Sequence, residues 1–314
     1  MGKSDKWFVI RNPAAGSGQG KILWPKIEQF LQEAGIKGEF VETNHPQHAI
    51  SLVNEGVKKG YRKFIAVGGD GTNNEVINGI FQQELVAPSE LIYTLIPVGT
   101  GNDWIKTHGI PNDFKKWTPQ ITTGKIIEQD IGILSYYKNG KQERRYFTNV
   151  AGLAFDAHIC EVAEKSNKNQ SNQLFYLGLI FRELFNYRLR KARVTFDDKI
   201  VEDYFYTINI GICRYSGGGM QFVPHAIPND GLLALTLAGK FSPLGVLINS
   251  WRFYSGRIAG HSKVQMFKTK KIQIESLEKE PTLVEVDGEF LGEAPVEISI
   301  IEKALRVIIP KRIK

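Results

Sequence analysis

Hydrophobic residues in the first third of the chain occur in short runs, and a glycine-rich segment follows each run. The runs cover positions 7–10, 64–67 and 91–98. Behind each glycine segment the apolar spacing becomes that of a helix, over 22–34, over 73–81 and over a shorter third stretch. Strands that alternate with helices predict a parallel sheet with helices on its faces. Ligands of such sheets bind beyond the carboxyl ends of the strands, where all three glycine segments would lie.

The start of the second helix carries a capping pattern. Thr72 and Glu75 have the T-x-x-E spacing of a capping box, which predicts a helix fixed directly behind Asp70 and Gly71. The following apolar positions share one helix face, and they are Val76, Ile77, Ile80 and Phe81.

The pattern changes after about position 129, where strand-like runs become frequent. Turn residues separate them, including Asn139-Gly140, Asn229-Asp230-Gly231 and Asp287-Gly288, and helical stretches are expected near 172–190 and 243–255. We therefore predict an α/β nucleotide-binding domain at 1–128 and a mostly antiparallel β-sandwich domain at 129–314, whose last residues pack back on the first domain. The predicted strands are 131–137, 145–150, 192–196, 204–212, 232–237, 271–274, 282–286, 296–301 and 305–309.

The first glycine segment, 12–21, has the composition of a phosphate loop but fails two common templates. A Walker A motif needs glycine where Ala15 stands and Ser or Thr where Ile22 stands, and a dinucleotide fingerprint needs glycine in place of Lys21. The remaining interpretation is a flexible loop at a helix N-terminus, which suits an anion. The alternative is a plain glycine-rich turn.

The second segment, Gly68-Gly69-Asp70-Gly71-Thr72, is more specific. Its glycines let backbone N–H groups approach a polyphosphate closely. Asp70 would repel phosphate, so its presence favours a group that binds Mg²⁺ or accepts a proton from an attacking hydroxyl. The alternative is an aspartate that stabilises a tight turn.

The third segment, Gly99-Thr100-Gly101-Asn102-Asp103, has the same construction. Asp103 could be a helix N-cap and nothing more. Two aspartate-bearing glycine loops on one sheet edge nevertheless favour a shared phosphate and metal site.

These segments resemble the diacylglycerol kinase catalytic-domain superfamily, which includes bacterial diacylglycerol kinase-like lipid kinases and sphingosine kinases. The resemblance continues through Asn149, Gly152 and 155–157 to the turns at 230–232 and 286–289. It implies an α/β domain like that of phosphofructokinases and NAD kinases, a β-sandwich domain, ATP and the lipid hydroxyl in the cleft between them, and a requirement for Mg²⁺.

The resemblance also assigns roles to residues. Asp70 becomes the candidate general base, Asp287 is held open as its rival, and Glu289 and Asp103 add carboxylates to a network with water and Mg²⁺. Asp230 and Leu232 resemble a structural Mg²⁺ site, with a plain hairpin turn as the alternative. The residues expected around the nucleotide are Asn12, Gly16, Gly18, Thr43, Gly68, Gly69, Gly71, Thr72, Glu75, Gly99, Thr100 and Asn102.

Several features bear on the substrate. Many members have other residues where Trp104, Lys106 and His108 stand, which would change the rim of the cleft. The stretch 174–190 either packs on a sheet or dips into a membrane interface, and its end carries basic residues that either balance charge or face solvent, namely Arg182, Arg188 and Arg190. His45 and His48 have no accompanying carboxylate or cysteine cluster, so we expect a surface loop there.

Charge and composition set the remaining expectations. The 314 residues carry a formal net charge of +7, which suits anionic partners such as nucleotides and acidic lipid surfaces, while no nucleic-acid-binding motif is present. The two cysteines form no motif, and neither a signal peptide nor a membrane-spanning run is expected. We expect a cytoplasmic enzyme in peripheral contact with a membrane; a twofold homodimer is only the base-rate assembly.

The function predicted from the sequence is transfer of the γ-phosphoryl group of ATP to a hydroxyl of a membrane lipid, of the diacylglycerol or long-chain-base type. The first alternative is an enzyme like NAD kinase that phosphorylates a soluble nucleotide. The second is a catalytically inactive nucleotide or lipid sensor, although Asp70, Asp103, Asp287 and Glu289 are all in place.

Overall fold

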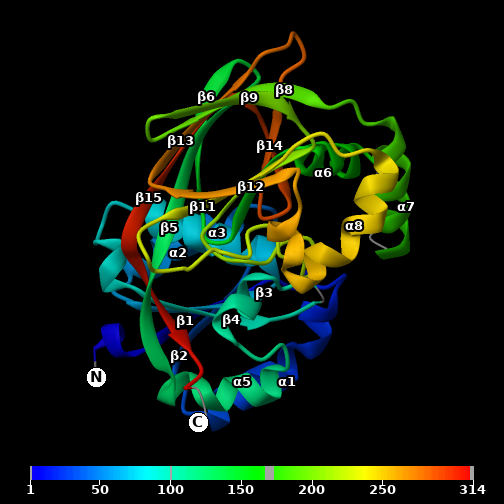
Figure 1. The fold of residues 1–314 in the computed structure, drawn as a ribbon. Helices are drawn as coiled ribbons and strands as arrows, with labels where there is room; N and C mark the ends of the chain where they lie inside the picture. Colours follow the sequence, from blue (N-terminus) through cyan, green and yellow to red (C-terminus); the bar gives the residue numbers. More distant parts are fainter. Residues whose placement is uncertain (1, 100, 167–172, 312–314) are drawn as a thin grey trace. The chain divides into compact units, whose positions relative to one another are not determined.

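The computed structural model describes residues 2–99, 101–166 and 173–311, and the chain forms two compact units (Figure 1). Unit 1 comprises Met1–Ile131 and Glu302–Lys314, and unit 2 comprises Gly132–Ile301. The chain passes between them inside two strands, β5 (Lys125–Lys138) and β15 (Glu289–Ile309).

Unit 1 is built on a parallel sheet in the order β15-β4-β3-β1-β2. The predicted parallel α/β architecture is therefore confirmed. The strands that complete it beside β15 are β1 (Trp7–Arg11), β2 (Gly38–Glu42), β3 (Lys63–Gly68) and β4 (Ile92–Pro97). The central residues of β1, β3 and β4 are buried because helices cover them, which is why these strands read as continuous apolar runs, whereas the edge strand β2 has no buried residue.

Three longer helices supply most of the cover of this sheet: α1 (Gln19–Glu33), α2 (His48–Lys58) and α3 (Asp70–Gln82). Their apolar faces are buried through residues such as Ile27, Val53 and Ile77. Shorter segments complete the unit: η1 (Lys3–Asp5), η2 (Pro88–Glu90), α4 (Trp104–His108), α5 (Phe114–Trp117) and η3 (Thr118–Thr123).

Unit 2 is a β-sandwich whose layers share one strand. One layer runs in the order β12-β11-β10-β7-β14, the other contains β5, β6, β13, β8 and β9, and β15 pairs with β14, β13 and β5. The strands not yet bounded are β6 (Lys141–Phe147), β7 (Val150–Ala154), β8 (Arg190–Phe196), β9 (Lys199–Phe205), β10 (Thr207–Gly211), β11 (Leu233–Ala238), β12 (Val264–Thr269), β13 (Lys271–Ser276) and β14 (Leu283–Val286).

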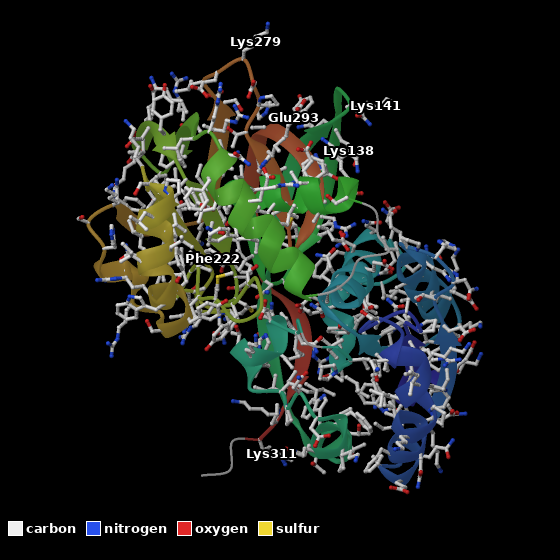
Figure 2. The ribbon with its side chains drawn as sticks, turned by 90° about the vertical axis from the view of Figure 1, so that its right-hand side faces the viewer. Lys138, Lys141, Phe222, Lys279, Glu293 and Lys311 are labelled. Carbon is white, nitrogen blue, oxygen red and sulfur yellow. The ribbon has the colours of Figure 1, made fainter. Side chains whose placement is uncertain are left out.

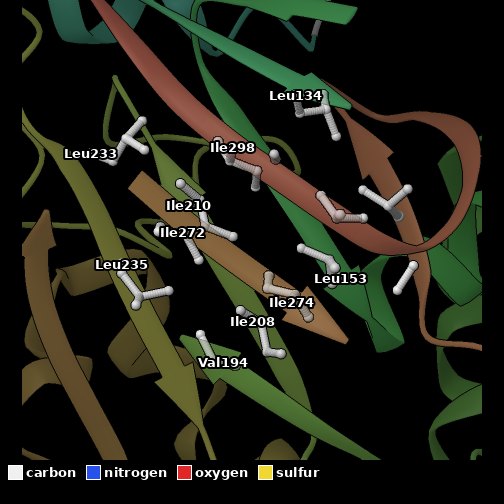
Figure 3. Close-up of a cluster of buried hydrophobic side chains, with 14 of the residues drawn as sticks. Leu134, Leu153, Val194, Ile208, Ile210, Leu233, Leu235, Ile272, Ile274 and Ile298 are labelled. Carbon is white, nitrogen blue, oxygen red and sulfur yellow. The ribbon is translucent and has the colours of Figure 1, made fainter. Parts of the chain in front are cut away.

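The core of unit 2 lies between the two layers. Figure 3 shows Ile208, Ile210 and Leu235 of one layer facing Ile272 and Ile274 of the other. Along β8 and β13, buried residues alternate with more exposed ones, as expected when one face of a sheet packs on the core and the other faces solvent. The predicted β-sandwich is thereby confirmed.

The helical segments of unit 2 are α6 (Phe155–Lys165), α7 (Gln173–Asn186), α8 (Pro243–Ser255) and η4 (Arg257–Gly260). They pack around a satellite cluster centred on Phe155, Tyr206 and Phe241. Within α7, Leu184 is buried in this cluster whereas Phe181 and Phe185 are exposed, so the helix both packs and leaves apolar surface. No helix in the described part of the chain has the length and hydropathy that a bilayer span requires.

Two-residue turns close the hairpins as their sequences predicted. Asn139-Gly140 and Asp287-Gly288 both have positive φ at both positions, as type I′ turns require. The strand predictions at 296–301 and 305–309 need correction, because β15 is continuous there, with an irregular position at Lys303 (φ +51°). Helices α2 and α6 and strand β12 were not predicted from the sequence.

The predicted capping box at Thr72 is wrong. Helix α3 already begins at Asp70, its N-cap is Gly69, and no side chain caps it. Thr72 therefore lies inside the first turn, and Glu75 projects toward another element.

Candidate functional site

The glycine loops of unit 1 meet at the carboxyl edge of the parallel sheet. Between the first and third loops, the backbones of Gly16 and Gly99 lie so close that a Cβ on Gly16 would stand 2.9 Å from the Cα of Gly99. Gly99 also has φ of +107°, a conformation essentially restricted to glycine. Both glycines are therefore required by the contact itself.

The first loop is also tied to the second. Asn12 Nδ2 donates to Thr72 Oγ1 at 3.0 Å, and Asn12 Oδ1 accepts from the Ala14 amide at 2.9 Å. A Cβ on Gly68 would lie 2.4 Å from Thr72 Oγ1, so glycine is needed where β3 enters α3. The Asn12 side chain thus fixes the entry of its own loop against the start of α3.

Asp70 links the second loop to the third. Its carboxylate accepts hydrogen bonds from the Asp103 amide at 2.9 and 3.1 Å, and a longer one of 3.4 Å from the Trp104 amide. Asp70 stands at the first position of α3, beyond β3, and the amides belong to the start of α4, beyond β4. The aspartate that the sequence singled out therefore holds the third loop in place.

Asp103 is the second carboxylate at this edge. It is buried, and its Oδ1 forms an ion pair of 2.6 Å with the ammonium group of Lys106 one turn later in α4. Lys106 is about one-third exposed, so its ammonium group reaches the surface beside the loops while Asp103 neutralises its charge.

Asn102 has an unusual hydrogen-bond pattern. Its Nδ2 donates to the Gly99 carbonyl and to Asn112 Oδ1, both at 3.0 Å. Its Oδ1 is buried and has no partner within the described residues, and a Cβ on Gly69 would lie 3.6 Å from it. A buried acceptor without a donor costs about 1–3 kcal/mol, which a ligand hydroxyl or a water would recover.

The other expected nucleotide residues have different settings. Gly18 is the N-cap of α1 with φ of +90°, Gly71 lies in the first turn of α3, and Thr43 follows β2 with its amide bonded to the Arg11 carbonyl at 2.9 Å. Thr100 lies outside the described residues. Glu75 accepts from the Gln47 and Ala49 amides at 2.8 and 3.2 Å, and so caps the start of α2.

The expectation that Trp104 and His108 form the rim of a cleft is wrong. Both side chains are buried in unit 1, with their rings 4.6 Å apart, and Trp104 donates to Gln129. Burial lowers the pKa of His108 to about 4, which a hydrogen bond with Gln129 only partly offsets. His108 is therefore a neutral core residue at physiological pH.

In unit 2, Asp287 lies in the turn between β14 and β15, and Glu289 directly follows this turn. Asp287 has φ of +51°; its Oδ1 accepts from the Val150 amide and its own amide donates to the Val150 carbonyl, both at 3.0 Å. Glu289 forms a 2.6 Å ion pair with the buried Arg145. The turn thus presents two carboxylates that are anchored to β7 and β6.

Two carboxyl groups near this turn, the buried Glu285 and the half-buried Asp156, were given no role from the sequence. Glu285, in β14, accepts from the Gly288 amide at 2.7 Å, and burial followed by the charge of Asp156 raises its pKa well above the usual range. Burial raises the pKa of Asp156 to about 6, although Thr207 donates to it at 2.6 Å. A charged residue between Val284 and Val286 in a strand was the signal that could have revealed Glu285.

The region expected to hold a structural Mg²⁺ does not fit that ion as it stands. Asp230 accepts from the Leu232 amide through Oδ1, and its Oδ2 pairs with the Lys268 ammonium group at 2.5 Å. Among the described residues, no group of three or more His, Cys, Asp or Glu side chains could hold a metal ion. We therefore assign no chemistry to a metal here.

The remaining candidates are surface groups. Arg182 pairs with Glu183 at 2.8 Å and Arg190 pairs with Glu280, while Arg188 is exposed. The rings of His45 and His48 stack at 4.7 Å, and His48 accepts from the Asn44 amide. Each arginine pair is explained by local charge, and neither requires a ligand.

Parallel α/β architecture, glycine loops at the carboxyl edge and a following β-sandwich define a class of kinases. The diacylglycerol kinase catalytic domain matches residues 6–134, and the YegS C-terminal NAD kinase beta sandwich-like domain matches residues 149–309. The chain belongs to the diacylglycerol kinase catalytic-domain family whose members carry this second domain. Membership in a kinase family implies the use of ATP.

Individual relatives agree with this assignment. The chain is 28% identical over 311 residues to the diacylglycerol kinase of Staphylococcus carnosus, covering 98% of this chain and 95% of the relative, and 28% identical over 306 residues to that of Staphylococcus aureus strain RF122, covering 97% and 92%. Its fold resembles a crystal structure of a diacylglycerol kinase from Bacillus anthracis (TM-score 0.73, 22% identity, 99% and 98% covered) and that of yeast NADH kinase complexed with NADH (TM-score 0.54, 11% identity, 98% and 84% covered).

Proposed function

We propose that the protein transfers the γ-phosphoryl group of ATP, taken up with Mg²⁺ as a substrate complex, to a hydroxyl group of a membrane lipid, with diacylglycerol as the first candidate. Family membership and relatives named diacylglycerol kinase support this choice of acceptor. The nucleotide phosphates would lie along the glycine loops of unit 1. The protein's contribution is then mainly positioning and charge neutralisation.

The observation that carries the proposal is the arrangement around Asp70. The Asp70 carboxylate holds the start of α4, and the loop that leads from β4 to α4 contains Asn102, whose buried Oδ1 has no partner among the residues that the structure describes. A carboxylate placed by backbone amides at the end of a glycine loop suits the orientation of an acceptor hydroxyl. Asn102 Oδ1 could accept a hydrogen bond from a hydroxyl group bound there.

Asp287 remains the rival general base, and substitution can separate the two. Asp70→Asn keeps an oxygen for the α4 amides, and Asp287→Asn keeps a residue that tolerates positive φ, so both variants should fold. Loss of the base should reduce kcat by at least about 100-fold, whereas the other variant should lose less. Asn139→Asp, in the comparable turn between β5 and β6, serves as the control for turn chemistry.

The test of the function is transfer of labelled γ-phosphate from ATP to a total lipid extract and, separately, to purified diacylglycerol and a long-chain base. We expect a labelled lipid with wild-type protein and almost none with whichever of Asp70→Asn and Asp287→Asn removes the base. Labelled NADP formed from NAD, with no labelled lipid, would replace this proposal by a nucleotide kinase, the alternative that the fold likeness to NADH kinase keeps in view. ATP binding without any product would indicate a sensor.

A further inference from the structure

Helix α8 turns an apolar face toward solvent. Its outward side chains are between 37% and 63% exposed, and they are Leu244, Leu247, Ile248, Trp251 and Tyr254. Positions three, four and seven apart share one face of a helix, so these five side chains form a single stripe, which we call the α8 stripe. Figure 2 shows α8, in yellow, at the outer edge of unit 2.

The attachment of α8 to unit 2 is shallow. Val246 and Phe253, seven positions apart on the other side of the helix, pack against the satellite cluster. None of the thirteen residues of α8 is fully buried. An ordinary surface helix buries its most apolar face, whereas α8 exposes it, and such a patch marks an interaction site.

Charge identifies the kind of partner. Between Asp230 and Glu275 the sequence contains no acidic residue, although the whole chain has 33. The same interval contains seven basic residues, namely Lys240, Arg252, Arg257, Lys263, Lys268, Lys270 and Lys271. Lys240, Lys268 and Lys271 pair with Asp203, Asp230 and Glu297, and Lys270 also has an interaction of its own, so the positive charge that flanks the stripe comes from Arg252, Arg257 and Lys263.

The positive charge gathers at the end of the helix. Arg257 and Lys263 are exposed, and Arg252 lies 5.2 Å from the ring centroid of Trp251. The pKa of His261 is lowered by burial and then by the charges of Arg252 and Lys263, which shows that both lie near it. Aromatic and aliphatic side chains with basic residues beside them are typical of helices that lie in a membrane interface.

We propose that the α8 stripe docks unit 2 on an anionic lipid bilayer, with the helix lying in the plane of the interface. Charge complementarity favours an acidic membrane over a neutral one, and exposed Trp251 and Tyr254 suit the boundary between headgroups and acyl chains. The inference deepens the proposed function, because it names the surface through which a lipid kinase would reach its substrate.

Vesicle flotation with the full chain tests the proposal. Wild-type protein should float with vesicles that contain phosphatidylglycerol and much less with pure phosphatidylcholine. Leu244→Ser with Ile248→Ser should weaken binding by about tenfold or more, because two large apolar side chains leave the interface. Ile200→Ser is the matched control, since this isoleucine of unit 2 is as exposed as Ile248 but lies on β9. Wild-type protein that does not float, or a double variant that floats as well, would overturn the proposal.

Fluorescence gives a second measurement at one residue. Trp251 should move to a less polar environment on binding, so the emission of the wild type should shift to the blue when phosphatidylglycerol vesicles are added. Trp251→Phe, which keeps an aromatic ring for binding, should bind vesicles without that shift. A shift of unchanged size in this variant would show that another of the five tryptophans reports the contact and that the stripe is not inserted.

Activity assays separate this inference from the proposed function. The double serine variant should phosphorylate a short-chain diacylglycerol in solution as the wild type does, but should lose activity on lipid in vesicles. Flotation without phosphorylation of any lipid would overturn the kinase proposal and support docking. A concentration-dependent dimer that the double variant abolishes, without vesicle binding, would assign the stripe to a second copy of the chain and overturn docking.

Discussion

Two glycines of the third loop differ in what they would tolerate. Gly99 has φ of +107° and contacts Gly16, whereas a Cβ on Gly101 would meet no atom within 4 Å. We expect Gly99→Ala to lower the unfolding temperature and to weaken ATP binding about tenfold, because the strained backbone costs roughly 1–3 kcal/mol. Thermal unfolding and ATP titration measure both effects. Gly101→Ala should change little, and equal effects at the two positions would contradict this role for the Gly16 contact.

Asp156 predicts a pH-dependent stability. Its pKa is raised by burial to about 6, above its unfolded value, so the folded state binds more protons between the two values. Stability from this group is therefore present below the unfolded pKa and is lost as pH rises through 6, by up to about 3 kcal/mol. Urea unfolding at pH 5 and pH 8 should show a smaller loss in Asp156→Asn than in the wild type. A loss of equal size in the variant would assign the effect to another group.

At the scale of residues, a role could be predicted from the sequence where a residue type does not suit the expected function of its loop. Asp70 stood out because a carboxylate does not suit a loop that only binds anions, and the structure gives it amide partners. Glu285 and Asp156 were given no role from the sequence, because the charge of Asp156 acts on Glu285 only in the folded chain and the two residues lie 129 positions apart. The assignment of the general base to Asp70, with Asp287 as the alternative, stays a prediction.

At the scale of elements, α2 depends on a side chain from its neighbour. The Gln47 and Ala49 amides at its start are bonded by Glu75 of α3, and no side chain of its own N-cap residue does so. A carboxylate at this end also interacts favourably with the helix dipole. Two helices are thus joined by one residue.

Glu75→Ala should therefore destabilise unit 1 by about 1–2 kcal/mol, since it removes two capping hydrogen bonds and a favourable charge. Glu75→Gln should lose less, because the amide oxygen can still accept from one backbone N–H. Chemical denaturation measures both, and exposed Glu84→Ala is the control. If Glu75→Ala changed only ATP affinity and left stability intact, its role would be nucleotide binding rather than capping.

The capping box was predicted from the spacing of two residues within one helix turn. The prediction failed because of contacts with residues far away in the sequence. Thr72 accepts a hydrogen bond from Asn12, and Glu75 accepts one from Gln47 at the start of α2, so both partners lie outside α3. The hairpin turns at 139–140 and 287–288 were predictable because positive φ is a property of the turn residues themselves. Helix α6 was overlooked because Asp156, Cys160 and Glu161 obscure its apolar face.

At the scale of the whole molecule, the charge of +7 predicts a salt dependence. Exposed charges are screened over about 10 Å at 0.1 M salt and about 3 Å at 1 M. Raising salt toward 1 M should weaken binding to phosphatidylglycerol vesicles by about tenfold, leaving the apolar part of the attachment. Phosphorylation of a short-chain lipid in solution should change less than about twofold. Flotation and activity assays across a salt series measure the two effects, and parallel losses would place the charge effect at the nucleotide site.

The order of a parallel α/β region and a β-rich region was predictable, because the period of the apolar pattern changes near position 129. Strand partners were not, since pairing joins distant positions. β15 illustrates this: it pairs with β14 and β13 in unit 2, and its last residues run parallel to β4, with Arg306 opposite Ile92. Only the apolar character of Leu305 and Val307 hinted at a buried strand.

That path of β15 bears on how the protein can be made. During translation the strands β1 to β4 emerge early, but the partner that covers the open side of β4, where Thr94 Oγ1 donates to the Ile308 carbonyl, emerges only after all of unit 2. The sheet that carries the glycine loops therefore has one unpaired edge until the end of β15 has been synthesised. A nascent chain should acquire affinity for ATP late and abruptly, and a chaperone that shields strand edges would find its substrate in this interval.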